Sequence, residues 1–116
     1  MLNQRHAAAQ AVANELFPAE RGVDDAIIHG SKLAIAVIEG RRAAKVPLST
    51  GQEGLDYVVR ANVQLCEARR LLAQAHTAFR VTQIEVGLQA MSYGDNQECP
   101  PSKGQLQIVP SSASAA

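Results

Sequence analysis

The side chains best suited to chemistry in this sequence are three histidines, two cysteines and one pair of adjacent carboxylates. His6, His29 and His76 lie far apart, and neither the His-x-x-x-His nor the Cys-x-x-Cys spacing of metal sites occurs. The glycines follow none of the phosphate-binding spacings. The sequence therefore predicts no metal site and no cofactor.

Nucleophilic catalysis has equally little support. A nucleophilic thiol needs a base within hydrogen-bond reach, whereas His76 follows Cys66 by ten residues, about 15 Å along one helix. We predict that Cys66 is a small buried apolar side chain, and Cys99 lies in a proline-rich segment. Asp24 and Asp25 are adjacent, so on a helix they diverge. We expect no enzyme and no small-molecule substrate.

A line of polar side chains recurs at seven-residue intervals: Asn62, Arg69, His76 and Gln83. It could be a ladder that recognises a partner, or a small site. It could also be the polar flank of a coiled coil, where such residues set partner choice and orientation. We favour the interpretation that these residues form the polar flank of a coiled coil, because it is the simpler one.

The composition excludes several classes of protein. The 116 residues include 11 basic and 11 acidic side chains, so the formal net charge is zero. This balance disfavours nucleic-acid binding by phosphate neutralisation, although Arg41, Arg42, Lys45 and Arg60 would gather at one end of a hairpin. That length predicts one domain, or one domain with a tail.

No membrane or secretory segment is predicted. The longest apolar run covers residues 33–38, too short to cross a bilayer, and the N-terminus lacks the apolar centre of a secretory signal. Two cysteines in unlike contexts do not form a disulfide framework. We expect a cytoplasmic protein, or a virion component assembled in the host cytoplasm.

Prolines divide the chain into segments. Pro18, Pro47 and Pro100 separate a short helix over residues 3–17, a long helix over 19–46 and a longer one over about 51–88. Ser49 and Thr50 have capping-box spacing at the start of the last helix. The short connection at Pro47 makes the two long helices antiparallel. The predicted fold is all-α, with a helical domain over residues 1–91 and a Pro/Gly/Ser/Gln-rich tail over 92–116.

The last helix carries a coiled-coil pattern. Large side chains recur every seven residues, and small ones follow each of them by three. The large line is Val58, Leu65, Leu72, Phe79 and Val86, and the small line is Ala61, Ala68, Ala75 and Thr82. Alanines in a seam let a partner backbone approach closely.

The preceding helix offers a matching groove of small residues at four-residue spacing: Gly22, Ala26, Gly30 and Ala34. We predict a packing interface that includes Gly30 and Ala34 together with the two lines from Val58 to Phe79. The sequence leaves open whether the alanine line faces this helix or another copy of the chain.

Further apolar residues of that helix fit no single stripe: Ile27, Ile28, Leu33, Ile35 and Ile38. A helix that is apolar on several faces is buried on several faces. Either the short first helix covers these residues, or another protein chain does.

One stretch resembles a known kind of protein. An Ala-Arg-Arg…Ala-His helix over residues 68–76 continues into a Gly-Leu pair at 87–88, a Gly-Asp pair at 94–95 and Pro100-Pro101. This order is similar to the end of small uncharacterised helical proteins of bacterial, phage and prophage genomes. The resemblance covers about the last half of the chain. It implies a small phage or prophage helical protein, such as a virion or assembly component, and it carries over no functional residue.

These observations favour a non-catalytic structural or assembly protein that acts through helix packing and through its tail. Leu106, Ile108 and Val109 form the apolar centre of that tail and suit docking on a neighbour by strand addition. The partners would be other copies of this chain or other assembly proteins. The alternative is a small dimeric regulator or adaptor that binds a single host or phage protein.

Overall fold

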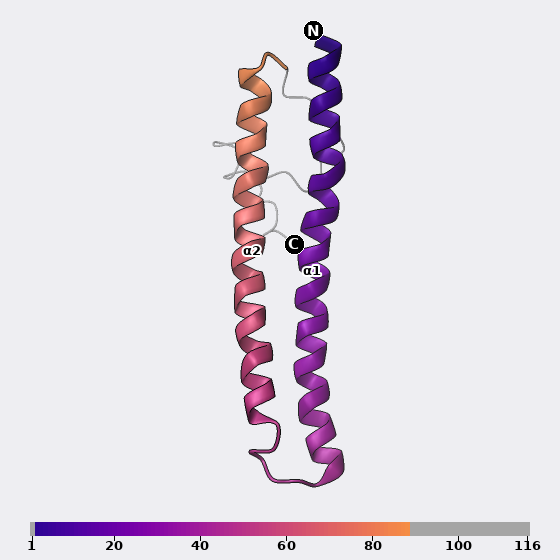
Figure 1. Cartoon of the computed structure of the whole chain (residues 1–116), viewed down its shortest axis with the longest axis vertical. Coiled ribbons are helices and arrows are strands. Elements are labelled where there is room, and N and C mark those ends of the chain that lie inside the picture. The colour runs from indigo at the N-terminus through magenta and orange to yellow at the C-terminus, as the bar shows by residue number, and fades with distance from the viewer. Residues whose placement is uncertain (1, 89–116) are drawn as a thin grey trace, which may run out of the picture.

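The computed structural model describes residues 2–88, which form two long antiparallel helices (Figure 1). Helix α1 spans Leu2–Ala44 and helix α2 spans Gln52–Glu85. A short connection around Pro47 joins them at one end of the hairpin. The all-α fold and the antiparallel hairpin are confirmed, whereas the predicted tail lies outside the described residues.

The predicted short first helix is not separate, because α1 continues through Pro18 without a break. A proline inside a helix removes one backbone hydrogen bond and costs about 3 kcal/mol. The alanine-rich turns before it favour the helix, and Leu16 and Phe17 pack towards α2. Pro18 itself is exposed, so its ring lies on the solvent side. Packing on the neighbouring face offsets the lost hydrogen bond.

Helix α1 ends in a Schellman motif. The Lys45 N–H donates to the Arg42 carbonyl at 3.1 Å, and the Val46 N–H donates to the Arg41 carbonyl at 3.4 Å. Lys45 occupies the left-handed position with φ 56°, where glycine is the preferred residue. The lysine therefore holds a conformation that its Cβ disfavours.

Replacing Lys45 with glycine is expected to stabilise the hairpin by about 1 kcal/mol, because the left-handed conformation costs an L-residue about 1–2 kcal/mol. Urea unfolding followed by circular dichroism would measure the change. Lys45→Ala serves as the control, since it removes the same side chain but keeps the Cβ. An equal gain for both variants would assign the effect to the lysine charge and contradict this account.

Helix α2 begins differently from the sequence prediction. Its N-cap is Gly51, with φ 80° and no side-chain capping bond, so neither predicted capping box forms. The chain enters the helix through two tight turns, in which Thr50 N–H donates to Pro47 O and Gln52 N–H to Ser49 O. Because Gly51 must adopt a positive φ, glycine is the residue that this entry requires.

Helix α2 also ends in a Schellman motif. Leu88 N–H donates to Gln83 O at 3.1 Å and Gly87 N–H to Ile84 O at 3.0 Å, with Gly87 at φ 89°. Leu88 is 3% exposed. The Arg5 guanidinium donates to Val86 O at 2.8 Å, which ties the start of α1 to the end of α2.

The two helices meet along one seam with alternating three- and four-residue spacing, as in a coiled coil. The α1 seam residues, none of them exposed, are Ala9, Ala13, Leu16, Glu20, Val23, Ile27, Gly30, Ala34, Val37 and Arg41. The α2 residues in the matching register are Leu55, Val58, Asn62, Leu65, Arg69, Leu72, His76, Phe79 and Gln83.

One seam buries few side chains completely. Among the described residues only Leu16, His76 and Leu88 are buried. Large apolar side chains remain exposed on both helices, including Leu33 at 51% and Leu71 at 52%. Neither helix holds a stretch apolar enough to cross a lipid bilayer. The hairpin therefore leaves much apolar surface uncovered within the described chain.

Candidate interaction site

The polar line of α2 faces α1. We call Asn62, Arg69, His76 and Gln83 the polar ladder. Its first three members each contact α1, and Gln83 is half-buried. The structure thus places in the seam a line that we expected at its flank. These contacts position the two helices relative to each other.

His76 is the most buried ladder residue, at 3% exposure. Its Nδ1 lies 3.0 Å from Glu20 Oε2, and its ring meets the Phe17 ring edge-on with centroids 5.9 Å apart. The carboxylate satisfies the imidazole inside the seam, and the aromatic edge packs its other face. His76 is therefore a polar residue that the hairpin can bury without a large penalty.

Arg69 makes the next contact across the seam. Its Nε lies 2.6 Å from Asp24 Oδ1, and both side chains are at least half exposed. The hydrogen bond with Asp24, helped by the opposite charge, raises the pKa of the Arg69 guanidinium above its ordinary value. Water screens this pair, so it contributes to helix register more than to stability.

Asn62 sits against a glycine. Its Nδ2 donates to Ser31 Oγ at 3.3 Å, and its amide lies directly over Gly30. A Cβ at Gly30 would lie 3.0 Å from Asn62 Cγ and closer still to Oδ1. Asn62 Oδ1 is buried and accepts no hydrogen bond in the described chain. Gly30 therefore makes the room that lets an amide enter the seam.

The other predicted packing residues fall in two groups. Gly30 and Ala34 of α1 and Val58, Leu65 and Leu72 of α2 are half-buried on the seam. Phe79 belongs to the same line but is 46% exposed. Gly22 has open space where a Cβ would stand, so of the two groove glycines close packing explains only Gly30.

The alanine line lies at the rim of the seam. Ala61 is exposed, and Ala68 and Ala75 are half-buried. Each precedes a ladder residue by one position, so it points about 100° around α2 from that residue. Within the single hairpin, the polar ladder takes the second line of the seam and the alanines border it.

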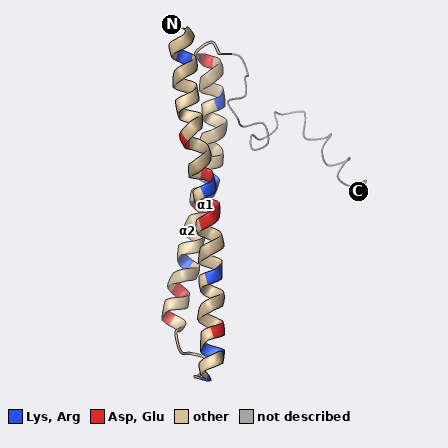
Figure 2. Cartoon of the chain, turned by 90° about the vertical axis from the view of Figure 1, so that its right-hand side faces the viewer, with Lys and Arg blue, Asp and Glu red and all other residues tan. Residues whose placement is uncertain are grey.

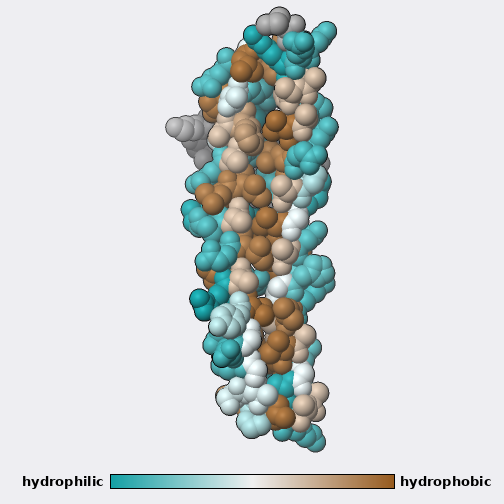
Figure 3. Space-filling view, viewed as in Figure 1, coloured by the Kyte–Doolittle hydropathy of each residue, from teal (hydrophilic) through white to brown (hydrophobic). Residues whose placement is uncertain are grey.

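The hairpin consequently has two unlike faces. On α1, Phe17, Asp24 and Ser31 contact the ladder and mark one side. The α1 residues three positions after Ala9, Leu16, Val23 and Gly30 fall on the other side, with the alanine line. On this side lie Val12, Ala19, Ala26, Leu33, Ala61, Ala68, Ala75 and Thr82, with the exposed Glu15 and His29 among the α1 residues. Figure 3 shows apolar surface running down the middle of the hairpin between hydrophilic edges.

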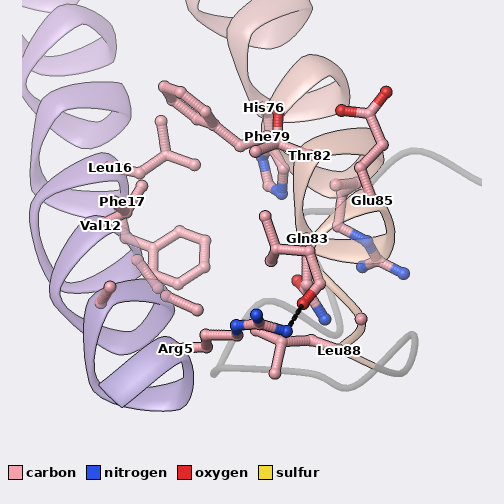
Figure 4. Close-up of a pocket in the computed structure, with 16 residues that line it drawn as sticks. Arg5, Val12, Leu16, Phe17, His76, Phe79, Thr82, Gln83, Glu85 and Leu88 are labelled. Carbon is pink, nitrogen blue, oxygen red and sulfur yellow. Dashed lines mark hydrogen bonds between the residues drawn. The ribbon is translucent and has the colours of Figure 1, made fainter. Parts of the chain in front are cut away.

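A cavity of about 650 Å³ opens between the helices at the free end of the hairpin. Val12, Leu16 and Phe17 line it from α1, and Phe79 and Leu88 line it from the other side (Figure 4). Figure 4 also shows Arg5 reaching across to the end of α2, where it donates to Val86 O. The walls are mainly apolar, so the cavity suits apolar groups.

Charges of both signs alternate along the hairpin rather than gathering in blocks (Figure 2). Two of the basic residues expected near the turn have local partners. Arg41 donates to Val46 O at 3.3 Å, and the Arg60 guanidinium lies 5.5 Å from the centre of the Tyr57 ring. The Arg41 contact lies at the end of α1 and the Arg60 contact lies within α2, so both guanidinium groups have partners inside the hairpin.

Residues that could bind metal do not gather within the described chain, where no three His, Cys, Asp or Glu side chains come together. Cys66, expected to be buried, is exposed, because it lies one residue beyond the seam on the ladder side. The tail residues Leu106, Ile108 and Val109 lie outside the described residues. The chain matches no protein-family model, no curated protein and no solved structure.

Proposed function

We propose that this protein is a non-catalytic structural or assembly protein that works by packing its helices against another polypeptide. The observation that carries the proposal is the apolar surface that the hairpin leaves open. Fifteen large apolar side chains are exposed among the described residues. Contiguous exposed apolar surface marks interaction sites in soluble proteins.

The distribution of this surface supports the proposal. Ile28, Ile35 and Ile38 are 49%, 54% and 38% exposed, so the hairpin itself does not cover the residues that fit no single stripe. The part of the chain expected to cover them is the first stretch of α1, which runs on as one straight helix and cannot fold back. Nothing else in residues 2–88 covers these isoleucines, which supports a second chain as their cover.

The resemblance to phage and prophage helical proteins directs the proposal towards a virion or assembly component. Detection of the chain by mass spectrometry in purified particles would support that role. A second candidate, a small regulator or adaptor that binds one protein, is favoured by the apolar cavity at the free end of the hairpin. A single docked segment could fill a cavity of that size.

Sedimentation velocity of the full chain and of a chain ending at Pro101 tests the proposal. We expect the full chain to sediment as species larger than its 12.3 kDa monomer. The truncated chain should keep its helicity and associate less, because the proposed docking tail is gone. A full chain that remains monomeric over the whole concentration range would contradict an assembly role and favour the adaptor.

A further inference from the structure

We propose that a second copy of this chain packs on the ladder side of the hairpin, over a patch that we call the isoleucine face. The patch contains every residue that directly follows a seam residue in the middle of the hairpin: Ile28, Ser31, Ile35 and Ile38 of α1 and Val59, Val63 and Cys66 of α2. This inference rests on the proposed function, and it names the partner and the surface.

The two helices bring these residues together in one patch. The hydrogen bond from Asn62 to Ser31 fixes which residues of α1 and α2 are level with each other. Counting from this bond in opposite directions on the antiparallel helices places Ile28 beside Cys66 and Val63 beside Ser31. The residues of the isoleucine face are therefore continuous across the hairpin.

The isoleucine face is an exposed apolar patch inside a ring of charges. Its five large apolar side chains are between 38% and 60% exposed, and none of its seven residues is Asp, Glu, Lys or Arg. The next residues at the same helix positions are Asp24 and Arg42 on α1 and Asp56 and Arg70 on α2. The outer edges, which point away from the seam, carry Lys32 and Glu39 on α1 and Arg60 and Glu67 on α2. An apolar centre with a polar rim is the usual anatomy of a protein interface.

The area of this surface is sufficient for a reversible dimer. The rise from Asp24 to Arg42 is about 27 Å at 1.5 Å per residue, and two helices side by side are about 20 Å wide. The isoleucine face and its charged ends therefore cover about 500 Å² in each copy, and a dimer would bury about 1,000 Å² in total. This is the lower limit for a specific interface, so we expect a dimer that dissociates on dilution.

Charges at one end of the isoleucine face favour a second copy as the partner. Asp24 and Arg70 have opposite signs and are level on the two helices, because Asp24 bonds to the neighbouring Arg69. A two-fold axis along the hairpin sets α1 of one copy opposite α2 of the other, so each Asp24 meets Arg70 of the other copy. Asp24 already accepts from Arg69, and Arg70 already donates to Glu67. A carboxylate and a guanidinium each have capacity for a further hydrogen bond.

The same axis matches the apolar groups. It places Ser31 opposite Val63 of the other copy, so a small side chain faces a larger one. Every neighbouring pair of helices is then antiparallel, as in an up-and-down four-helix bundle. At the rim the axis brings Lys32 near Arg60, but both are exposed and water screens their repulsion. Apolar contact therefore supplies the affinity, and the charges at the end fix the orientation.

The test uses two matched substitutions on α1, in full-length chains. Ile35 belongs to the isoleucine face and is 54% exposed, whereas Leu33 lies on the side of the alanine line and is 51% exposed. Ile35→Glu and Leu33→Glu therefore add the same charge at nearly equal exposure on opposite sides of one helix. We expect Ile35→Glu to raise the dimer dissociation constant at least about 30-fold in sedimentation equilibrium, and Leu33→Glu to change it less than about threefold.

The native thiol of Cys66 gives a second measurement that leaves the isoleucine face unchanged. In a chain in which Cys99→Ser removes the other thiol, Cys66 should react with a thiol reagent at least about fivefold more slowly in concentrated than in dilute protein, because dimerisation covers it. The control is Ala61→Cys, on the side of the alanine line, in a chain with both native cysteines replaced by serine. Its thiol should react at the same rate at both protein concentrations.

The outcomes separate this inference from the proposed function. Equal effects of the two glutamate substitutions, or a loss of association in Leu33→Glu alone, overturn the isoleucine face as the interface while leaving self-association intact. A Cys66 reaction rate that is independent of protein concentration, in a chain that associates, overturns it as well. A native chain that never associates overturns both this inference and the assembly role.

Discussion

Replacing Gly30 with alanine should destabilise the hairpin by about 2–3 kcal/mol, because the new methyl group would overlap the Asn62 amide. The nearest atom after Oδ1 would be Asn62 Cγ, at 3.0 Å. To make room, the amide must rotate away and give up its hydrogen bond to Ser31, or the helices must separate at this layer. Urea unfolding followed by circular dichroism measures the loss.

Gly40→Ala is the matched control for this substitution. Gly40 lies on the same helix, and no atom lies within 4 Å of the position that its Cβ would occupy. This variant should gain about 0.5–1 kcal/mol, because alanine favours a helix more than glycine does. The two glycine-to-alanine changes thus have opposite expected signs, and a gain in both would contradict the Asn62 contact.

A double-mutant cycle identifies the contact responsible. With Asn62→Ala present, Gly30→Ala removes no amide contact and should be neutral or stabilising. The coupling free energy between the two positions should then be about 2 kcal/mol or more. Equal costs of Gly30→Ala in the native and Asn62→Ala backgrounds would place the strain elsewhere.

Replacing His76 with alanine should cost about 3 kcal/mol. His76 is 3% exposed, packs against the Phe17 ring and partners Glu20, whose side chain is 19% exposed. The substitution enlarges the cavity at the free end of the hairpin and leaves the Glu20 carboxylate without its partner, and both effects are unfavourable. Thermal and urea unfolding would measure the change.

His29→Ala is the control, since His29 is exposed on the same hairpin and its loss should cost less than about 0.5 kcal/mol. His76→Leu separates packing from hydrogen bonding, because leucine refills the space but cannot bind Glu20. We expect the free energy of unfolding of His76→Leu to lie between that of the native chain and that of His76→Ala. If His76→Leu were more stable than the native chain, apolar packing alone would explain this layer.

Much of the fold follows from the sequence alone. The heptad spacing from Val58 to Val86 gives a long helix, and the short connection at Pro47 makes it antiparallel to the one before. Local chemistry also gives the position of the turn, because proline fixes its own φ at Pro47 and glycine permits the positive φ found at Gly51.

The continuity of α1 depends on the tertiary structure. A proline predicts a helix boundary from local backbone chemistry. At Pro18 the neighbours Leu16 and Phe17 pack towards α2, and that contact comes from residues almost sixty positions later. Local propensity alone therefore gave the wrong boundary, since packing from elsewhere offsets the cost of the proline.

The rotation of α2 about its own axis likewise depends on the tertiary structure. A seven-residue repeat tells which side chains share a line along the helix, but both the alanine line and the polar ladder border the large line equally. The ladder faces inward because Glu20, Asp24 and Gly30 of α1 supply a carboxylate, a second carboxylate and an opening for an amide. As the ladder residue number rises along α2, the number of its α1 partner falls, as antiparallel pairing requires. The sequence by itself determined which residues form the alanine line and which form the polar ladder. Only contacts between distant residues could decide which of the two faces α1, because burial of a polar side chain depends on the partner that it meets.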